Sequence, residues 1–555
     1  MKSSRSIAYV LFIIQAYAAN GQQLQWFTSY GSVLANSEGR NLMVLPRGNG
    51  ELFGIGMAGG TTWDLDGNQV SVSGDSDVLL FELDEQGEAL WAATDGGNCE
   101  DPDPWDDTPR AALSDTLTGT LVVAGDYSGN ATFAGSGLSG WCAYRNMFIS
   151  AYGANGSGLW ASRATGPNIV ANDLLSGPDD NIHVFGKAID GPATFHATSD
   201  VVIEPGGFHA TYGNDGSLVQ AEQILTTGEV QDAVRYGTDF VLCGKFTGED
   251  TLWLSPLAPA APLTSGFLCR TSGTSSIAWS VVCGSSSWAE FIDCVGLSNG
   301  DIAVAGYFME DVFIGEDTLL ASGASSYDRF IGRFSPSGSL LWLRRVSSPQ
   351  FFVIRSLVAD SDGGFYMHGT VSTSLAIGNA TVACTTSRDQ FVARVDENGM
   401  WVGSLFLGRS GFSTLTGLHV VGDDIFVSGS FDSTMVIGSE SFEPMHMNWP
   451  DLFVAKFNGL APVNSVQSIG LLDDELHIYA NPSSGVCTMD LPASIVTGDP
   501  YTLTIFDALG AVVQRVPLTI QEDRIRLDIS AEAKGMYHVE LVDGKRRYSG
   551  TIVFQ

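Results

Sequence analysis

One pattern occurs seven times along this chain: a short apolar run that ends on a glycine. The anchor glycines lie about 62 residues apart, and periods of this order are typical of solenoids and propellers built from repeated supersecondary units. Such a repeat limits the chain to folds in which each unit buries its apolar faces against its neighbours. The seven copies are Leu52–Gly56, Leu121–Gly125, Ile182–Gly186, Phe240–Gly244, Ile302–Gly306, Phe365–Gly369 and Ile425–Gly429.

Each unit contains four strand-like runs, which the sixth copy shows at residues 354–358, 365–371, 391–395 and 401–407. Asp362-Gly363 joins the first two runs and Asn398-Gly399 joins the last two. Both dipeptides adopt the positive φ angles of tight hairpins. The second run is apolar on both faces, as strands are when other layers cover both sides. Two hairpins in series therefore predict a four-stranded antiparallel sheet in every unit.

The two ends of the repeat region complement each other. Residues 24–28 match the final strand of a unit, whereas the last unit stops after its third strand at 452–457. We expect the N-terminal segment to supply the missing strand and so remove an open sheet edge. Tryptophans mark this final strand in the other units: Trp91, Trp160, Trp279, Trp342 and Trp401.

These patterns predict an all-β chain. Residues 22–459 are predicted to form a seven-bladed β-propeller closed by its own N-terminal strand. The motif Asp-x-Phe-Val-x-Lys/Arg, clearest at Asp328, Asp389 and Asp451, resembles the β-propeller repeats of bacterial exported proteins. The repeat period is lost after Gly459, which predicts a linker over 460–470 and a separate domain over 471–555.

The charge balance excludes some partners. Acidic residues outnumber basic ones by 62 to 27, for a formal net charge of −35. Such a surface repels phosphate backbones and anionic lipid, so neither nucleic acid nor a membrane surface is an expected partner. Residues 1–20 have the basic start, apolar run and small residues of a signal peptide, and no other stretch is long enough to span a bilayer.

Export permits disulfides, and eight cysteines allow 105 pairings. Sequence proximity favours Cys99 with Cys142, Cys243 with Cys269 and Cys283 with Cys294. The alternative is that these cysteines are small buried thiols.

Three stretches stand in a fixed order near the C-terminus: 478–485, 503–510 and 527–539. They resemble the type A sorting domain of the type IX secretion system of Gram-negative bacteria, and this resemblance implies a small Ig-like β-sandwich over 471–555. The resemblance implies passage through the periplasm, translocation by the type IX machinery, and release or attachment at the outer surface. An accessory sandwich domain without a role in export is the alternative. The motif residues that match are Asn481, Pro482, Gly485, Gly510, Gly535 and Tyr537.

Two loops could bind ligands. Asp64, Asp66 and Asn68 resemble the start of a calcium loop, although turn formation alone also explains them. Trp105 lies among the carboxylates of 101–107 and could contact a sugar or a peptide, unless the loop is only a rigid connection.

The sequence contains no H-E-x-x-H, G-x-S-x-G or P-loop motif, and we predict no catalytic residue. We therefore expect a non-enzymatic binding or structural module whose partner is a glycan, a peptide or a matrix component. No cofactor is expected, with calcium as the possible exception. The alternative is an extracellular hydrolase of polysaccharide or protein that uses loop carboxylates at the propeller mouth.

Overall fold

The structure, a computed structural model, describes residues 23–555 apart from 35–37, 49, 100–106, 261–262, 316, 322–326, 351, 378–379, 385–388, 410–412, 439, 464–473, 492–499, 508–511, 521–523 and 543–546. The segment 1–20, most of the linker, Trp105 and Gly510 therefore lie outside the described residues. Every regular element in the described part is a β-strand, which confirms the all-β prediction. The chain divides into two compact units at Ser465 and Val466.

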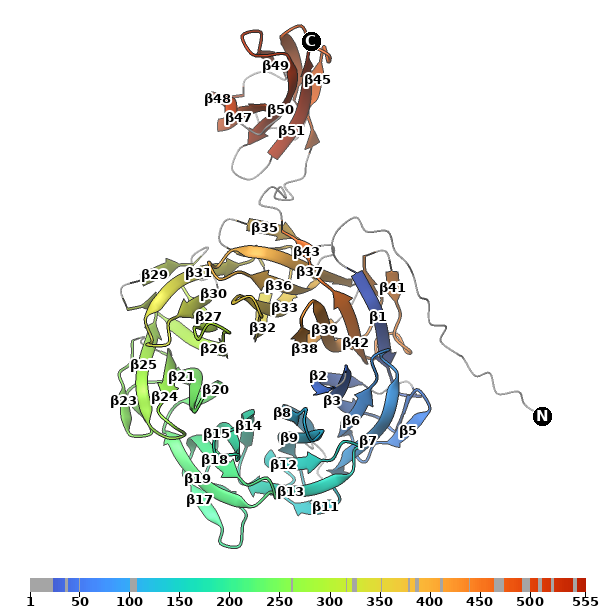
Figure 1. Cartoon of the computed structure of the whole chain (residues 1–555), viewed down its shortest axis with the longest axis vertical. Coiled ribbons are helices and arrows are strands. Elements are labelled where there is room, and N and C mark those ends of the chain that lie inside the picture. The colour runs from blue at the N-terminus through green and yellow to red at the C-terminus, as the bar shows by residue number, and fades with distance from the viewer. Residues whose placement is uncertain are drawn as a thin grey trace, which may run out of the picture. The chain divides into compact units, whose positions relative to one another are not determined.

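The first unit contains seven antiparallel sheets, each with a four-stranded core (Figure 1). We number them sheet 1 to sheet 7 in chain order. In each sheet the strands are given from first to fourth. Sheet 1 contains β2 (Gly39–Gly48), β3 (Glu51–Gly59), β6 (Ser76–Leu83) and β7 (Ala89–Asn98); sheet 2 contains β8 (Thr108–Asp115), β9 (Thr120–Tyr127), β12 (Asn146–Tyr152) and β13 (Gly158–Thr165); sheet 3 contains β14 (Ile169–Ser176), β15 (Ile182–Ala188), β18 (Gly206–Tyr212) and β19 (Leu218–Leu225); and sheet 4 contains β20 (Glu229–Tyr236), β21 (Asp239–Phe246), β24 (Ser265–Thr271) and β25 (Ile277–Gly284). Sheet 5 contains β26 (Trp288–Gly296), β27 (Ile302–Met309), β30 (Tyr327–Phe334) and β31 (Leu340–Ser347); sheet 6 contains β32 (Phe352–Ala359), β33 (Phe365–Val371), β36 (Asp389–Val395) and β37 (Trp401–Arg409); and sheet 7 contains β38 (Ser413–Val421), β39 (Asp424–Phe431), β42 (Asp451–Asn458) and β1 (Gln23–Tyr30).

The seven sheets lie around a ring, with their first strands nearest the centre and their fourth strands at the outside (Figure 1). The second and third strands are buried on both faces, as in β27 and β12. Apolar side chains of adjacent sheets share clusters; one cluster combines Val241 and Leu268 of sheet 4 with Phe291 and Val304 of sheet 5. The core of this unit therefore lies between neighbouring sheets.

Strand β1 comes from the N-terminal end of the described chain, yet it belongs to sheet 7. It pairs antiparallel with β42, with Phe27 opposite Ala455 and Tyr30 opposite Leu452. The Nε1 atom of Trp26 then donates a 3.0 Å hydrogen bond to the carbonyl of Glu85 in sheet 1. Strand β1 thus contacts the last sheet through its backbone and the first sheet through a side chain.

The same tryptophan contact recurs between other neighbouring sheets. Trp160, Trp279 and Trp342 each donate Nε1 to a carbonyl in the β-turn of the following sheet, at 2.8–3.0 Å. Each ring lies over the glycine of that turn, so close that a Cβ on Gly216 would lie 2.5 Å from Trp160. The sequence pattern of turn glycine and tryptophan therefore reflects packing between sheets.

A short hairpin between the second and third strands of each unit was not predicted from the sequence. Five of these hairpins pair with the fourth strand of the preceding sheet, which widens that sheet to six strands or more. The seven hairpins are β4 (Thr62–Leu65) with β5 (Asn68–Ser71), β10 (Asn130–Phe133) with β11 (Ser136–Ser139), β16 (Ala193–Phe195) with β17 (Val201–Ile203), β22 (Asp250–Leu252) with β23 (Ser255–Leu257), β28 (Asp311–Ile314) with β29 (Asp317–Leu320), β34 (Ser374–Ile377) with β35 (Ala380–Ala383), and β40 (Met435–Ile437) with β41 (Glu440–Phe442). Strand β43 (Ala461–Pro462) pairs with β37.

The second unit contains two sheets whose side chains share one apolar core. Leu503, Ile505 and Val539 come from the larger sheet, and Met489 and Leu527 come from the smaller. The larger sheet comprises β44 (Asp474–Glu475), β51 (Arg547–Phe554), β50 (Gly535–Val542), β47 (Pro500–Asp507) and β48 (Val512–Thr519); the smaller comprises β45 (His477–Tyr479), β46 (Val486–Asp490) and β49 (Arg524–Asp528).

Candidate functional site

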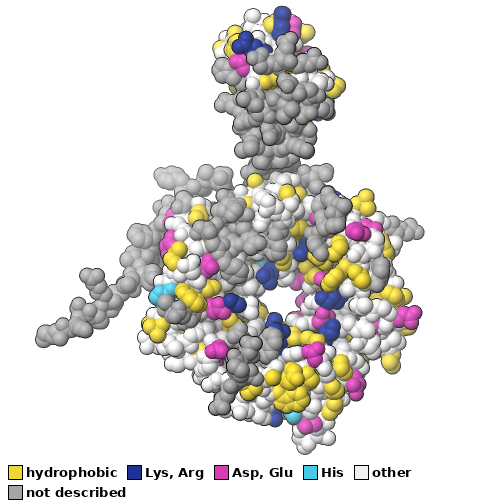
Figure 2. All heavy atoms as spheres, turned by 180° about the vertical axis from the view of Figure 1, so that it is seen from behind, with side chains coloured by type: hydrophobic (Ala, Val, Ile, Leu, Met, Phe, Trp, Pro, Cys, Tyr) yellow, Lys and Arg dark blue, Asp and Glu magenta, His cyan; other side chains and the backbone are white. Residues whose placement is uncertain are grey.

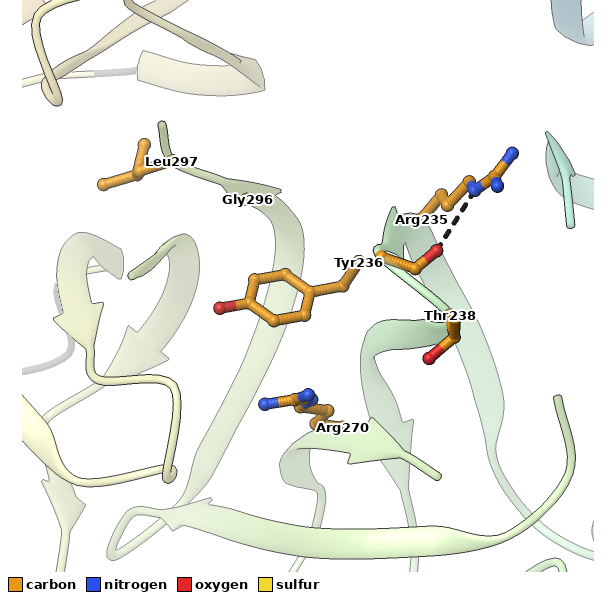
Figure 3. A pocket seen from close by; sticks show the side chains of 7 residues that line it. Arg235, Tyr236, Thr238, Arg270, Gly296 and Leu297 are labelled. Atoms are coloured by element: carbon orange, nitrogen blue, oxygen red, sulfur yellow. Dashed lines mark hydrogen bonds between the residues drawn. The ribbon is translucent and has the colours of Figure 1, made fainter. Parts of the chain in front are cut away.

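A pocket of about 410 Å³ lies where sheets 4 and 5 meet, at the end of their first strands. The turn between β20 and β21 forms one wall, and the end of β26 forms another (Figure 3). Its volume is within the range of small-ligand sites. The residues that line it are Arg235, Tyr236, Gly237, Thr238, Arg270, Gly296 and Leu297.

Arg270 is held firmly in this pocket. Its Nε and Nη2 atoms donate to Oδ2 of Asp239 at 3.0 and 2.8 Å, and Nη1 donates to the carbonyl of Pro336 at 3.2 Å. The guanidinium lies 4.7 Å from the centroid of the Tyr236 ring, and Figure 3 shows the two side chains facing each other. Burial raises the pKa of Asp239, but the Gly273 N–H and Arg270 outweigh it and leave this pKa below its usual value. The pair is therefore charged at neutral pH.

Arg235 differs from Arg270 because its guanidinium is exposed. Its Nε donates to the carbonyl of Gly237 at 3.3 Å, within its own turn (Figure 3). Across the described residues, no carboxylate forms an ion pair with it. Figure 3 shows the guanidinium of Arg235 at the edge of the pocket, turned away from Tyr236 and Arg270, where its remaining N–H groups are open to solvent and could donate to an anionic ligand.

A comparison along the repeat shows that Arg235 is a positive charge beyond the Lys/Arg–Asp pair that several units share. The Lys/Arg of the repeat motif pairs with an aspartate at the first turn in three other sheets, as Arg333–Asp301, Arg394–Asp360 and Lys456–Asp424. Arg270 and Asp239 are the equivalent pair in sheet 4. Arg235 is an additional cation that this pairing does not neutralise. Figure 2 also shows Lys and Arg side chains at the rim of the central opening.

Three carboxylates, Asp293 buried and Asp173 and Asp232 partly buried, form a second cluster on the first strands of sheets 3, 4 and 5. Asp173, Asp232 and Asp293 each follow a β-bulge. Each accepts a hydrogen bond from a backbone N–H of the next sheet, at 2.9, 2.9 and 3.2 Å. Burial raises all three pKa values, and repulsion by Asp232 raises those of Asp173 and Asp293 further. These side chains join neighbouring first strands.

The residues of the predicted calcium loop already have protein partners. Asp64 accepts from the Gly67 N–H and from Gln69, and Asp66 accepts from Tyr30 and from the Ala89 N–H. Asn68 donates its amide to the carbonyls of Leu65 and Ala89. These contacts account for the loop as part of the β4–β5 hairpin. Calcium binding there remains a prediction.

One predicted disulfide is present and two are not. Cys99 and Cys142 are bonded, whereas Cys243, Cys269, Cys283 and Cys294 are free thiols, so the pairings Cys243–Cys269 and Cys283–Cys294 are wrong. The register explains the first error. Cys243 lies opposite Leu268 and Cys269 lies opposite Leu242, which places the two thiols on opposite faces of sheet 4.

The second error has a related cause. Cys283 is on the fourth strand of sheet 4, opposite Gly266. Cys294 is on the first strand of sheet 5, opposite Val304. Closeness in sequence therefore does not bring these two thiols together.

The described residues of the sorting motif mainly hold the second unit together. Asn481 donates Nδ2 to the carbonyl of Thr551 at 2.6 Å and accepts from the Val553 N–H at 2.8 Å, which ties the motif loop to β51. The adjacent Pro482 is exposed. Gly485 has a φ of +109°, and a Cβ there would lie 2.8 Å from Ser530.

Two further motif residues lie at β50. Tyr537 is buried and donates its hydroxyl to the carbonyl of Ala533. Gly535 begins β50 and has no atom within 4 Å of where a Cβ would stand. The motif thus contributes mostly to folding.

Comparison with known proteins identifies this end of the chain. Residues 477–555 match the family described as "Secretion system C-terminal sorting domain". The chain therefore carries a type IX sorting domain, which supports export through that system to an extracellular or cell-surface location. No helix that could cross a membrane is found among the described residues.

Several solved structures are similar to the chain at low sequence identity. No curated protein matches the sequence. A protein of unknown function from Dyadobacter fermentans is 9% identical, with a TM-score of 0.34, and the match covers 79% of this chain and 99% of that one. A puromycin hydrolase mutant is 10% identical, with a TM-score of 0.36 and coverages of 83% and 61%. A xylan β-1,4-xylosidase from Bacillus halodurans C-125 is 8% identical, with a TM-score of 0.26 and coverages of 77% and 99%.

Proposed function

We propose that this chain is an exported binding protein whose first unit is a seven-bladed β-propeller, closed by β1, that takes an anionic ligand of sugar size in the Arg235 pocket. The second unit is a β-sandwich of the type A sorting class that delivers it through the type IX machinery. Residues 1–20 are the signal peptide. The observation that carries the binding function is an exposed guanidinium without a carboxylate partner in a pocket with no acidic lining residue.

Contacts at the two ends of the repeat support closure of the propeller. Besides the contacts of β1, the hydroxyls of Thr416 and Ser428 in sheet 7 donate to the carbonyl of Leu42 in sheet 1, at 2.7 and 2.9 Å. The Gly39 N–H donates to the carbonyl of Pro450 at 2.7 Å. Sheets 7 and 1 are thus joined both near the centre and at the outside, as consecutive sheets are.

The chemistry of the pocket supports an acidic sugar as the ligand. A guanidinium donates paired N–H groups in a planar fork that suits carboxylate and sulfate oxygens. The hydroxyl of Thr238 donates to Oδ1 of Asp239 at 3.4 Å, and its oxygen adds a neutral acceptor to the lining of the pocket. Uronate and sulfated sugars offer both an anionic group and hydroxyls. Arg235 would bind the anionic group, and the Arg270–Asp239 pair would form a fixed part of the pocket wall.

Binding assays with the full chain test this function. We expect uronate-rich and sulfated polysaccharides to bind and neutral glycans not to bind, with affinity that falls as salt rises. Arg235→Ala should weaken binding about 10–100-fold, because a charge-assisted hydrogen bond contributes about 1.5–3 kcal/mol.

Arg345→Ala is the matched control. Arg345 is also exposed and has a 3.0 Å hydrogen bond to a carbonyl, that of Leu320, but it lies away from the pocket. Equal binding by wild type and Arg235→Ala, or a preference for neutral glycans or acidic peptides, would contradict the proposed ligand.

A hydrolase remains the second candidate, because Asp173, Asp232 and Asp293 have raised pKa values near the ring centre. A carboxyl that stays protonated at neutral pH can act as a general acid. Against this function, each of the three accepts a backbone N–H from the next sheet. Asp232→Asn separates the two functions: a hydrolase would lose turnover of polysaccharide while retaining its fold, whereas a structural carboxyl would change the unfolding temperature alone.

A further inference from the structure

Two of the free cysteines meet beside a carboxylate where sheets 4 and 5 pack together. Asp232 lies directly opposite Cys243 in the pairing of β20 with β21. Cys294 approaches from β26 and donates its backbone N–H to Oδ2 of Asp232 at 2.9 Å. One carboxylate oxygen and the two Sγ atoms all lie within 4.8 Å of one another. Both thiols are buried, whereas Asp232 is partly exposed.

The repeat shows what stands at these positions elsewhere. In sheet 3, Asp173 lies opposite Phe185 and binds the N–H of Ala233. In sheet 5, Asp293 lies opposite Ala305 and binds the N–H of Leu357. The aspartate therefore joins sheets at all three interfaces, but the two thiols occur together at one of them. Joining the sheets does not explain the cysteines.

We propose that Asp232, Cys243 and Cys294 bind a zinc-type d¹⁰ cation between sheets 4 and 5. Two thiolates and a carboxylate are ligands that zinc prefers, and a water molecule can complete a tetrahedron. Thiolates at 2.3 Å from zinc lie about 3.8 Å apart, so the donor atoms need to move by no more than about 1 Å. The partly exposed Asp232 gives the ion a path from the ring centre.

Proton release gives this site a characteristic pH dependence. Zinc binding would release the protons of Cys243 and Cys294 to solvent as the two Zn–S bonds form. Zinc affinity should therefore fall as the pH is lowered.

The test uses the full chain, reduced, loaded with Zn²⁺ and desalted before its metal content is measured. We expect one zinc per chain, and a sulfur-to-metal charge-transfer band when Cd²⁺ replaces Zn²⁺. Cys243→Ala and Cys294→Ala should lose the band and weaken zinc binding at least about 10–100-fold. Mutation of residues that only hydrogen-bond to metal ligands already causes a loss of this size. Alanine already occupies the equivalent positions 305 and 233, so both variants should fold.

Cys269→Ala is the control. Cys269 is equally buried in sheet 4 but packs in a different core cluster from Cys243. This variant should retain zinc and the Cd²⁺ band. A reduced chain that retains no zinc, variants that retain as much as wild type, or a Cys243–Cys294 disulfide in the exported protein would each overturn the proposal.

Discussion

Turn glycines that pack against tryptophan side chains link neighbouring sheets at the outer edge of the circle of sheets. Gly87, Gly156 and Gly216 each have a positive φ, and a Cβ on any of them would lie 2.5–2.7 Å from an indole atom. Two independent effects therefore disfavour any larger residue at each of these glycines: the positive φ of the backbone and the contact with the indole. Sheet 3 has Val219 in place of the tryptophan, and the turn glycine of the following sheet, Gly273, has no atom within 4 Å of where a Cβ would stand.

Gly156→Ala and Gly135→Ala separate the two effects, since both glycines have a φ of +75° but only Gly156 faces an indole. Both changes should cost about 1–2 kcal/mol from left-handed strain. Gly156→Ala should cost about 1–3 kcal/mol more, because the Trp91 ring must move. Urea unfolding of the two variants measures the difference. Equal destabilisation would show that the tryptophan contact contributes nothing.

Asp77 should make stability depend on pH. Burial raises its pKa to about 6, above the unfolded value of about 3.9. The native state then binds more protons than the unfolded state between these pH values, so this contribution lowers stability as pH rises from about 4 to 6. Asp77→Asn should be more stable than wild type at pH 8, by up to about 3 kcal/mol, and similar at pH 3. Thermal unfolding at both pH values checks this.

The exposed Asp215 provides the control for that experiment. Hydrogen bonds from Ser217 lower its pKa, so Asp215→Asn should give no gain at pH 8. If Asp215→Asn were stabilised at pH 8 as much as Asp77→Asn, the effect would come from the lower net charge and not from the burial of Asp77.

The roles of residues that recur from repeat to repeat were predictable from the sequence, whereas the roles of residues that occur once were not. The tryptophans and turn glycines repeat with the period, so their shared role is visible in the sequence. The role of Arg235 is found only from the pocket that folding creates. The thiols of Cys243 and Cys294 meet because register and sheet packing place them together, and spacing along the chain does not encode either.

At the scale of elements, the four strands of each unit were predicted well and the outer hairpins were missed. The sixth unit has strands at Phe352–Ala359, Phe365–Val371, Asp389–Val395 and Trp401–Arg409, close to the predicted runs. The hairpin strands have only three or four residues, too few for alternation to show. Their pairing with another unit's sheet is also a tertiary contact that local sequence does not specify.

Removal of β1 should destabilise sheet 7 and expose the edge of β42. Deletion of Gln23–Tyr30 removes backbone hydrogen bonds along a paired strand, at about 1 kcal/mol each, together with the aromatic contacts of Phe27. We expect a lower unfolding temperature and self-association by size-exclusion chromatography, because open edges pair with other chains. A synthetic peptide of this sequence should reverse both effects, and a scrambled peptide should not. An unchanged, monomeric truncation would show that β1 does not complete the sheet.

At the scale of the whole molecule, the sorting domain and the proposed binding pocket belong to separate units. Residues 477–555 match a sorting-domain family, whereas no curated protein matches the sequence. Sequence alone therefore predicted where the protein goes better than what it binds.

Export should depend on the stability of the second unit. Asn481→Ala removes both hydrogen bonds to β51 and should destabilise this unit by about 1–3 kcal/mol. We expect accumulation in the periplasm and less protein in the medium or at the surface, measured by fractionation. The neighbouring exposed residue gives the control Ser484→Ala, which should be exported normally. If Asn481→Ala destabilised the second unit but the protein were still exported normally, export would not depend on the stability of this unit.

The most direct test of the closed ring is a photo-crosslink from position 26. Trp26 pairs with Lys456 in sheet 7 and lies beside Glu85 and Gly87 in sheet 1. With benzoylphenylalanine at this position, peptide mapping of monomeric protein should find crosslinks to both sheets, from opposite ends of the repeat region. Crosslinks confined to residues near position 26 in sequence, or formed only between two chains, would contradict the closed ring.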